Sequence, residues 1–298
     1  MEARLVVQEK PELRAPYILA GLKGWLNAGD VSTGCIDYLR LKLGARVFAS
    51  IEPTGFYVYQ LPSSAAEQTL RPLVRIKEGL VRKLDMPRND FFSWKSGAAH
   101  DLILFLGAEP NLDWPEYARA ILDVARQFSV PRIYLLGGIF DQVPHTRKTR
   151  ILATVSHPRL KDDLAAFARF TDYEGPASFN TLLISSAREQ GIEMAGISAR
   201  VPLYIQELNA KACYDLLNNV LALTGLDIDL GELREAGTTL VEMMDKAFTK
   251  NTTAMEQLKK LEEQFDAASG DEPFPAGEDY DKLLAEMRKL KREGHKPH

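Results

Sequence analysis

Two short apolar runs constrain the fold of this chain more than any other feature of its sequence. Residues Asp101–Leu106 read DLILFL, and residues Ile133–Leu136 read IYLL. A strand with one face in water alternates apolar and polar residues, whereas a strand covered on both faces is apolar nearly throughout. The two runs therefore predict central strands of a sheet that carries helices on both of its faces.

Segments with helical spacing of apolar residues alternate with further strand-like runs along the first 248 residues. The expected helices cover residues 30–43, 114–128, 158–170, 181–189, 209–223 and 230–248. The other expected strands cover residues 5–8, 17–20, 46–52 and 194–201, with a β-rich excursion at 56–60, 73–77 and 80–84. Strands separated by helices are typical of βαβ units. We therefore expect an α/β core domain over residues 1–248, built on a mostly parallel sheet.

The character of the sequence changes near residue 249. We expect a helical C-terminal extension over residues 249–298, with a linker rich in proline, glycine and acidic residues at 269–279. Beyond the linker, Leu283, Leu284, Met287 and Leu290 fall on one helical stripe. This stripe is a candidate interaction surface, which could pack on the core domain, on a neighbouring subunit or on a partner protein.

Composition limits the possible classes of function. The 298 residues carry a formal net charge of −4, which argues against general affinity for nucleic acid or for anionic membranes. No apolar stretch reaches the roughly 18 residues of a membrane span. The two cysteines, Cys35 and Cys213, fit a reducing compartment and have no zinc-site spacing. We expect a cytoplasmic protein without a metal.

The best candidate for a binding site lies where the second apolar run ends. The pair Gly137–Gly138 follows that run, and His145, Thr146 and Arg147 follow in a proline-containing loop. Ligands of open α/β sheets bind beyond the carboxyl ends of the strands. His145 could be a general base beside the anion-binding Arg147. The same residues also fit an ordinary turn between strands, in which glycines and proline shape the backbone.

Two other segments are expected at the same edge of the sheet. A glycine-bearing turn with Lys23, Gly24 and Asn27 follows the strand at 17–20, although its spacing matches neither a dinucleotide fingerprint nor a phosphate-binding loop. Tyr173 and Glu174 form an acidic turn before a helix. If the site is structural, we expect Arg147 to pair with Glu174 or Asp141. If it is functional, Arg147 binds an anionic ligand.

The order of these motifs resembles the proteasome assembly chaperone 2 family in its prokaryotic branch. The resemblance covers roughly residues 5–245 and lies in the segments GLKGWLNAG, EPTGFY, LLGGIFDQVPHTRKTRI, DYEGPASFNTLLISSAREQGI, ARVPLYI and LTGLDIDLGEL. It implies a three-layer α/β fold similar to that of purine nucleoside phosphorylases, and homo-oligomers, with a trimer as the expected order. Eukaryotic members act as chaperones for proteasome α-rings. Members are often labelled as ATP-grasp superfamily proteins or carboxylate-amine ligases.

Two classes of function follow. The first is an oligomeric, assembly-chaperone-like interaction protein without catalytic residues or cofactor. The chain ends in Gly-His-Lys-Pro-His, without the hydrophobic–Tyr–any-residue ending of archaeal proteasome-binding relatives, so docking to a proteasome is not expected. The alternative is an enzyme that binds a nucleoside, a nucleotide or another anion at the two glycine turns, including an ATP-dependent carboxylate-amine ligase. The sequence contains no nucleophile elbow, HExxH motif or metal-carboxylate set, which favours the interaction protein.

Overall fold

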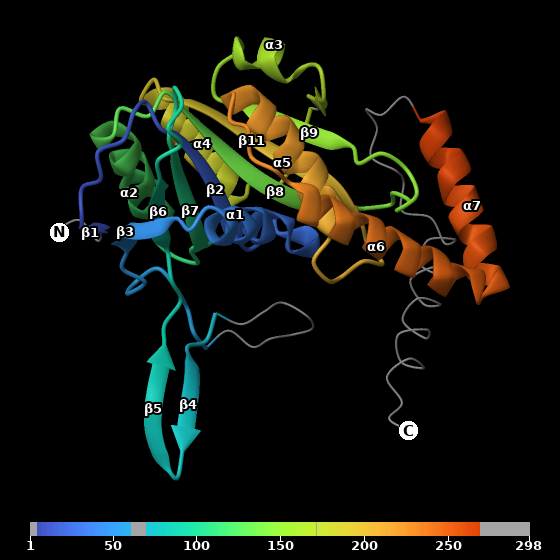
Figure 1. The fold of residues 1–298 in the computed structure, drawn as a ribbon, viewed down its shortest axis with the longest axis horizontal. Helices are drawn as coiled ribbons and strands as arrows, with labels where there is room; N and C mark the ends of the chain where they lie inside the picture. Colours follow the sequence, from blue (N-terminus) through green and yellow to red (C-terminus); the bar gives the residue numbers. More distant parts are fainter. Residues whose placement is uncertain (1–4, 61–69, 171, 269–298) are drawn as a thin grey trace.

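The computed structural model describes residues 5–60, 70–170 and 172–268. Its main feature is a nine-stranded sheet in the order β1-β3-β6-β7-β2-β8-β11-β9-β10 (Figure 1). The four central strands are β7 (Leu102–Ala108), β2 (Tyr17–Lys23), β8 (Arg132–Asp141) and β11 (Glu193–Pro202). These four are parallel to one another, so their carboxyl ends share one edge of the sheet.

The strands that flank this centre make the sheet mixed. On one side are β6 (Asp90–Trp94), β3 (Arg46–Ile51) and β1 (Leu5–Val7), each antiparallel to its neighbour. On the other side are β9 (Ile151–Val155), which is antiparallel to β11, and β10 (Ala168–Arg169), which is parallel to β9. The expectation of an α/β fold with a mostly parallel sheet is confirmed for the centre of the sheet.

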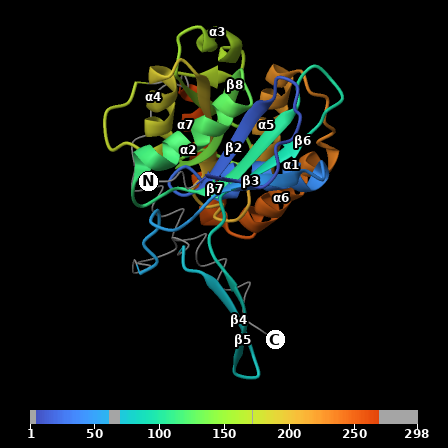
Figure 2. The same ribbon diagram turned by 90° about the vertical axis from the view of Figure 1, so that its left-hand side faces the viewer.

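Helices cover both faces of the sheet (Figure 2). On one face, α1 (Val31–Lys42) and α5 (Ala210–Thr224) pack in one apolar core with the sheet. On the other face, α2 (Trp114–Gln127) and α4 (Phe179–Glu189) pack in a second core. A 3-10 turn (Ala28–Asp30) leads into α1, and the short helix α3 (Leu160–Leu164) precedes β10. The layers are helix, sheet and helix, and none of the described helices is long and apolar enough to cross a membrane.

Two helices follow these layers along the chain and form a small third core. Helix α6 (Gly231–Thr249) packs on α5, and α7 (Thr252–Ala267) folds back along α6. Phe248 and Leu258 lie in this core together with Tyr204. Helix α7 falls within the predicted extension at 249–298. The predicted linker at 269–279 and the stripe of Leu283, Leu284, Met287 and Leu290 lie outside the described residues.

A two-stranded hairpin projects from the body of the molecule (Figure 1). Its strands are β4 (Leu73–Lys77) and β5 (Leu80–Asp85), and they form a separate sheet. The chain leaves the main sheet after Ile51 and returns at Asp90, which pairs with Leu106 near the end of β7. The hairpin therefore starts at the edge where the central parallel strands end.

The structure corrects the expected end of the strand at Gly137–Gly138. Strand β8 continues through both glycines to Asp141, paired along its whole length with β11. A Cβ atom on Gly138 would lie 2.3 Å from the carbonyl oxygen of Ala28. The glycine therefore allows the turn before α1 to pack directly on the strand, and does not end the strand.

Two other expected elements are also corrected. A helix was expected over 158–170, but α3 ends at Leu164 and the chain then adds β10 to the sheet. Leu160, Leu164 and Ala168 are all buried, so their helical spacing arises from two different elements. The strand expected at 56–60 is a series of turns, in which the neighbours Phe56 and Tyr57 are both buried.

Candidate functional site

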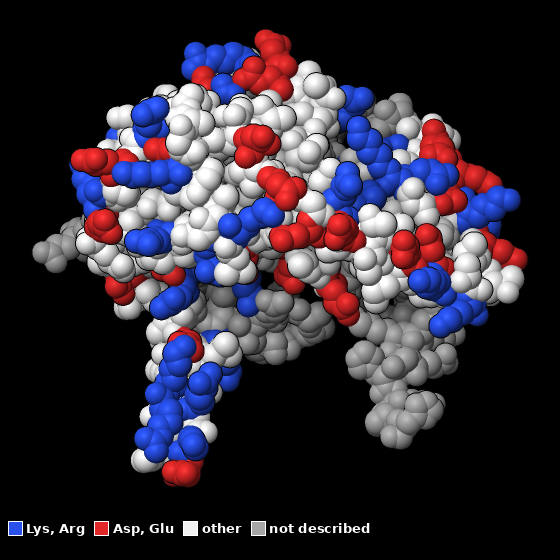
Figure 3. Space-filling view, in the orientation of Figure 1, with Lys and Arg blue, Asp and Glu red and all other residues white. Residues whose placement is uncertain are grey.

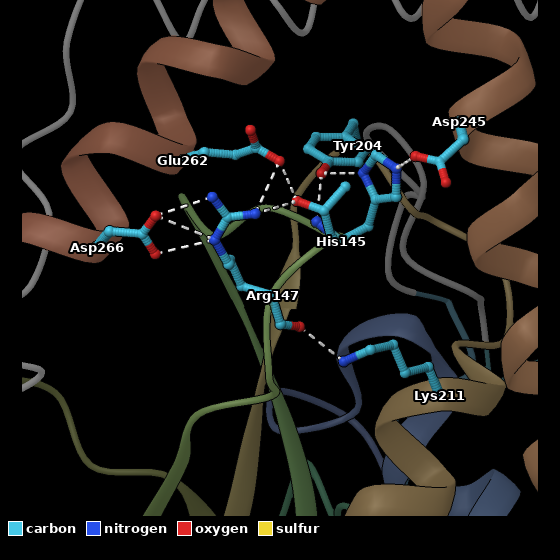
Figure 4. Close-up of polar contacts among 8 residues, drawn as sticks. His145, Arg147, Tyr204, Lys211, Asp245, Glu262 and Asp266 are labelled. Carbon is cyan, nitrogen blue, oxygen red and sulfur yellow. Dashed lines mark hydrogen bonds and ion pairs between the residues drawn. The ribbon is translucent and has the colours of Figure 1, made fainter.

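The loop between β8 and β9 directs His145 toward α6 (Figure 4). His145 is only 3% exposed. Its backbone N–H donates to the hydroxyl of Tyr204 at 2.8 Å, and its Nδ1 lies 2.8 Å from the same oxygen. Its Nε2 lies 3.1 Å from Oδ1 of Asp245 on α6. Both ring nitrogens therefore have partners from other parts of the fold.

These contacts assign one tautomer to the imidazole. A carboxylate can only accept, so Nε2 carries the proton and donates to Asp245, while Nδ1 accepts from the Tyr204 hydroxyl. Burial lowers the pKa of His145, and the hydrogen bond to Asp245 offsets this only in part. His145 is consequently neutral at pH 7 and offers no free nitrogen for general base catalysis.

The next two residues of the loop hold α7. The Nε and Nη2 atoms of Arg147 donate to the carboxylate of Asp266 at distances of 2.8 to 3.2 Å, and Nη1 donates to Glu262 at 3.1 Å. The hydroxyl of Thr146 also donates to Glu262. The guanidinium lowers the pKa of Asp266 because it hydrogen-bonds to the charged carboxylate. The loop thus joins the sheet to the C-terminal helices.

The partners of Arg147 correct the expected pairs. Asp141, the last residue of β8, pairs with the buried Arg200 at 3.1 Å. Glu174 is exposed in the loop before α4. The ion pair that was expected for a structural arginine exists, but its acids come from α7. These acids were not predicted, because α7 lies far from the loop in the sequence.

The space beneath the loop is too small for an organic ligand. It is enclosed by the loop and by residues of α5 and α6, and its volume is about 20 Å³. That volume holds about one water molecule, whereas sites for small organic ligands are of the order of 300–1,000 Å³. Lys211 reaches into this region and donates to the carbonyl oxygen of Arg147 at 2.8 Å and to Thr149 at 3.0 Å. Its contacts hold the loop from below.

The first glycine turn is tied to α4 by Glu109, which follows β7. One oxygen of Glu109 accepts from the backbone N–H of Trp25 at 2.7 Å, and the other accepts from that of Phe179 at 2.9 Å. A Cβ atom on Gly24 would lie 2.4 Å from this carboxylate. Glu109 therefore brings the ends of β2 and β7 and the start of α4 together.

The rest of this turn packs on β8. Asn27 forms a bridge with Gly138, and its side-chain oxygen accepts from the backbone N–H of Thr33 at 3.0 Å. Lys23 ends β2. Burial lowers the pKa of Lys23, and the nearby Asp30 offsets this in part. The packing and hydrogen bonds of the backbone in this turn therefore explain why glycine and asparagine occur there.

The predicted site residues therefore lie in three places. Lys23 ends β2, Gly24 and Asn27 lie in the turn that follows it, and this turn packs on Gly137 and Gly138 of β8. His145, Thr146 and Arg147 lie under α6 and α7. Tyr173 and Glu174 are exposed in the loop before α4. Whether any of them binds a ligand stays a prediction.

Several residues that shape these places were missed from the sequence. Glu109 could have been found, because it is the first charged residue after the apolar run of β7. Glu262 and Asp266 are four residues apart, so they share one face of α7. No feature of the sequence around Asp245 indicates that it contacts His145. Within residues 5–60, 70–170 and 172–268, no three His, Cys, Asp or Glu side chains are grouped as metal ligands.

The chain matches the model of the PAC2 family over residues 21–247. Among solved structures, a PAC2 family protein from Streptomyces avermitilis is 27% identical, with a TM-score of 0.69 over 78% of this chain and 95% of that one. A comparison with curated proteins gave no match.

Two further solved structures carry descriptions that concern the proteasome. A proteasome-assembly chaperone homologue from Mycobacterium tuberculosis is 24% identical, with a TM-score of 0.72 over 80% of this chain and 98% of that one. PbaB from Pyrococcus furiosus, an archaeal proteasome activator, is 26% identical, with a TM-score of 0.62 over 81% of this chain and 97% of that one. The first of these supports the fold alone.

Proposed function

The chain belongs to the PAC2 family, and from that premise we propose that it is a homo-oligomeric, assembly-chaperone-like protein of the cytoplasm that acts by binding other polypeptides. Its surface, and not a small-molecule pocket, is the functional part. PbaB, which is 26% identical, is described as an archaeal proteasome activator, and this supports a role in binding other proteins. The binding partner is a polypeptide, and its identity is not specified here.

One observation carries this proposal. The loop between β8 and β9 contains residue types that are common in catalysis, and their side chains form contacts within the protein. His145 bonds to Tyr204 and Asp245, and Arg147 bonds to Glu262 and Asp266. A site for a nucleotide would instead present such donors to an open cavity, and the space beneath this loop holds only about one water molecule. The contacts of the loop are those of a structural clamp.

The proposal is tested with the full-length chain in two parallel measurements. Thermal unfolding is followed with ATP, ADP, adenosine and inorganic phosphate, each at millimolar concentration. We expect no rise in Tm, because no described cavity at the loop accepts these ligands. In parallel, affinity purification from the source cell with quantitative mass spectrometry is expected to recover a protein partner at a fixed stoichiometry.

The alternative enzyme makes the opposite prediction. A rise in Tm with a phosphate-bearing ligand, lost in Arg147→Ala or in Lys23→Ala, would overturn the proposal. Arg119→Ala is the matched control, because Arg119 is an exposed arginine on α2 whose ion pair with Glu116 lies within that helix.

A further inference from the structure

A cleft lies at the edge of the sheet where the central parallel strands begin, opposite to the edge where they end. Its walls are the turn between β9 and α3, which stands at the top of Figure 1, and the turn between α4 and β11. Its volume is about 530 Å³, within the range of about 300–1,000 Å³ in which proteins bind small organic ligands. The cleft therefore has room for several side chains of another molecule.

The buried Ser156 joins the two walls of this cleft. Its hydroxyl donates to the carbonyl oxygen of Ile192 at 3.1 Å and accepts from the backbone N–H of Met194 at 2.8 Å. The backbone N–H of Ser156 donates to the carbonyl oxygen of Met194 at 2.8 Å. These bonds fix the position of one wall relative to the other, so the cleft is formed before any ligand binds.

The lining of the cleft is basic on a chain that is acidic as a whole. Arg159, Lys161 and Arg188 line it together with a single acid, Glu193. The net charge of the whole chain is −4. One oxygen of Glu193 accepts from Nε of Arg132 at 2.8 Å, and the other pairs with Arg159. Figure 3 shows red and blue side chains interspersed over the body of the molecule in that view. Three cations around one shared acid therefore distinguish the cleft.

Two of the three cations are available to a ligand. Lys161 and Arg188 are exposed, and no acid in the described part of the chain forms an ion pair with either of them. Their sequence neighbours Asp162 and Glu189 do not line the cleft. The ammonium of Lys161 lies 5.4 Å from the ring centre of Phe170, a contact that needs none of its hydrogen-bond donors. Both cations can therefore donate to carboxylates.

The backbone around the cleft argues against a phosphate site. The N–H of Lys161 donates to the carbonyl oxygen of Pro158 at 2.9 Å, and that of Ile192 donates to Ala187 at 2.8 Å. Phosphates of nucleotides typically bind where several unpaired backbone N–H groups converge. The half-buried side chains of Val155 and Ile192 add apolar surface to the lining. Cationic side chains beside apolar surface suit a glutamate side chain, which has an aliphatic stem and a carboxylate.

We propose that this cleft binds an acidic segment of a polypeptide partner. The carboxylates of the segment pair with the cations of the lining, and its aliphatic stems lie on Val155 and Ile192. Complementary charge of this kind also speeds the encounter of two proteins. The inference rests on the proposed protein-binding function and names the chemistry of the partner.

The first test measures the affinity of the full-length chain for a fluorescently labelled tetraglutamate peptide by anisotropy, at about 50 mM sodium chloride. We expect it to bind at least tenfold more tightly than tetraglutamine with the same label. Lys161→Glu with Arg188→Glu is the cleft variant. We expect it to bind tetraglutamate about tenfold more weakly or worse, because two attractive charge pairs become repulsive.

Arg46→Glu with Arg119→Glu is the matched control for the cleft variant. Both are exposed arginines outside the cleft, so the change in net charge is the same. Unchanged Tm values show that the variants stay folded. Equal affinities of the cleft variant and the control for tetraglutamate would overturn the inference, and so would a wild type that does not bind the peptide at millimolar concentration. ATP that displaces the peptide and binds more tightly than it would overturn the assignment to a polypeptide.

A second measurement separates this inference from the proposed function. Affinity purification from the source cell is repeated with the cleft variant and with the control. We expect the partner of the wild type to be lost from the cleft variant and kept by the control. A partner that stays bound to the cleft variant would overturn the inference while leaving the proposed function intact. A wild type that recovers no partner would overturn both.

Discussion

The side chains of His145 and Arg147 have the chemistry of an active site but serve as connections between distant elements. His145 is held as a neutral imidazole between Tyr204 and Asp245, with Phe248 5.2 Å from its ring centre. A buried neutral histidine packs without the cost of desolvating a charge. The contribution of His145 to the stability of the protein therefore depends on pH.

The pH dependence of stability follows from the lowered pKa of His145. Below about pH 6.5, a histidine of the unfolded chain takes up a proton that the folded state resists, so the unfolded state gains relative stability. Stability contributed by His145 is thus present at neutral pH and is lost as the pH falls. We expect the difference in unfolding free energy between wild type and His145→Asn to shrink from pH 7 to pH 5. Urea unfolding at both pH values measures it, and a difference that grows toward pH 5 would show that the folded state favours a protonated His145, against the neutral imidazole assigned here.

At the scale of elements, α7 depends on its contacts with the rest of the fold. Helices of about this length are marginal in water by themselves. Leu258, Leu261 and Phe265 bury its inner face, and Arg150 lies 3.6 Å over the ring of Phe265. The ion pairs of Arg147 with Glu262 and Asp266 add a polar connection at the same face. The loop between β8 and β9 is therefore the clamp that positions α7.

Replacing Arg147 tests the clamp. Its side chain is one-third exposed and that of Asp266 is about half exposed, so solvent weakens the pairs. We expect Arg147→Ala to lower stability only slightly, because ion pairs that are open to solvent contribute little. Amide hydrogen exchange should accelerate by roughly fivefold in α7, with α1 unchanged. Arg119→Ala is the control, because it removes an exposed arginine from an ion pair within α2. Faster exchange throughout the sheet would show instead that the loop supports the whole fold.

At the scale of the whole molecule, positive and negative charges are distributed unevenly along the chain. Residues 71–88, which include the hairpin of β4 and β5, carry a net charge of +4, and the remainder of the chain carries −8. Contacts between this basic segment and the acidic remainder of another copy would therefore gain from long-range attraction, which salt screens.

Self-association is accordingly expected to weaken as sodium chloride rises from 50 to 500 mM (roughly a threefold fall in the Debye length). Arg75→Glu should weaken association at low salt and flatten its dependence on salt, because it replaces a positive charge of residues 71–88 with a negative one. Sedimentation equilibrium measures both effects. Association that strengthens with salt would indicate an interface governed by apolar contact alone.

Local sequence patterns determined the layers of this protein. The apolar runs of β7 and β8 require cover on both faces, and the helical spacing between strands supplies it, because burial of apolar side chains depends on periodicity along the chain. The helical spacing of Leu160, Leu164 and Ala168 misled because the same period can arise from two elements. The parallel centre of the sheet could thus be predicted, while the extension of β8 to Asp141 depended on its pairing with β11.

Only the tertiary structure decided which charges meet. Arg147 had plausible acids in Asp141 and Glu174, but the chain delivers Glu262 and Asp266 from α7, more than one hundred residues away. Glu109 likewise acts through two backbone N–H groups whose positions depend on β2 and α4. Charge and hydrogen-bonding capacity are properties of single residues. The partner of a residue, in contrast, depends on which groups lie within bonding distance of it. Distance across the fold is set by how the layers pack, and that information is not local to any segment of the sequence.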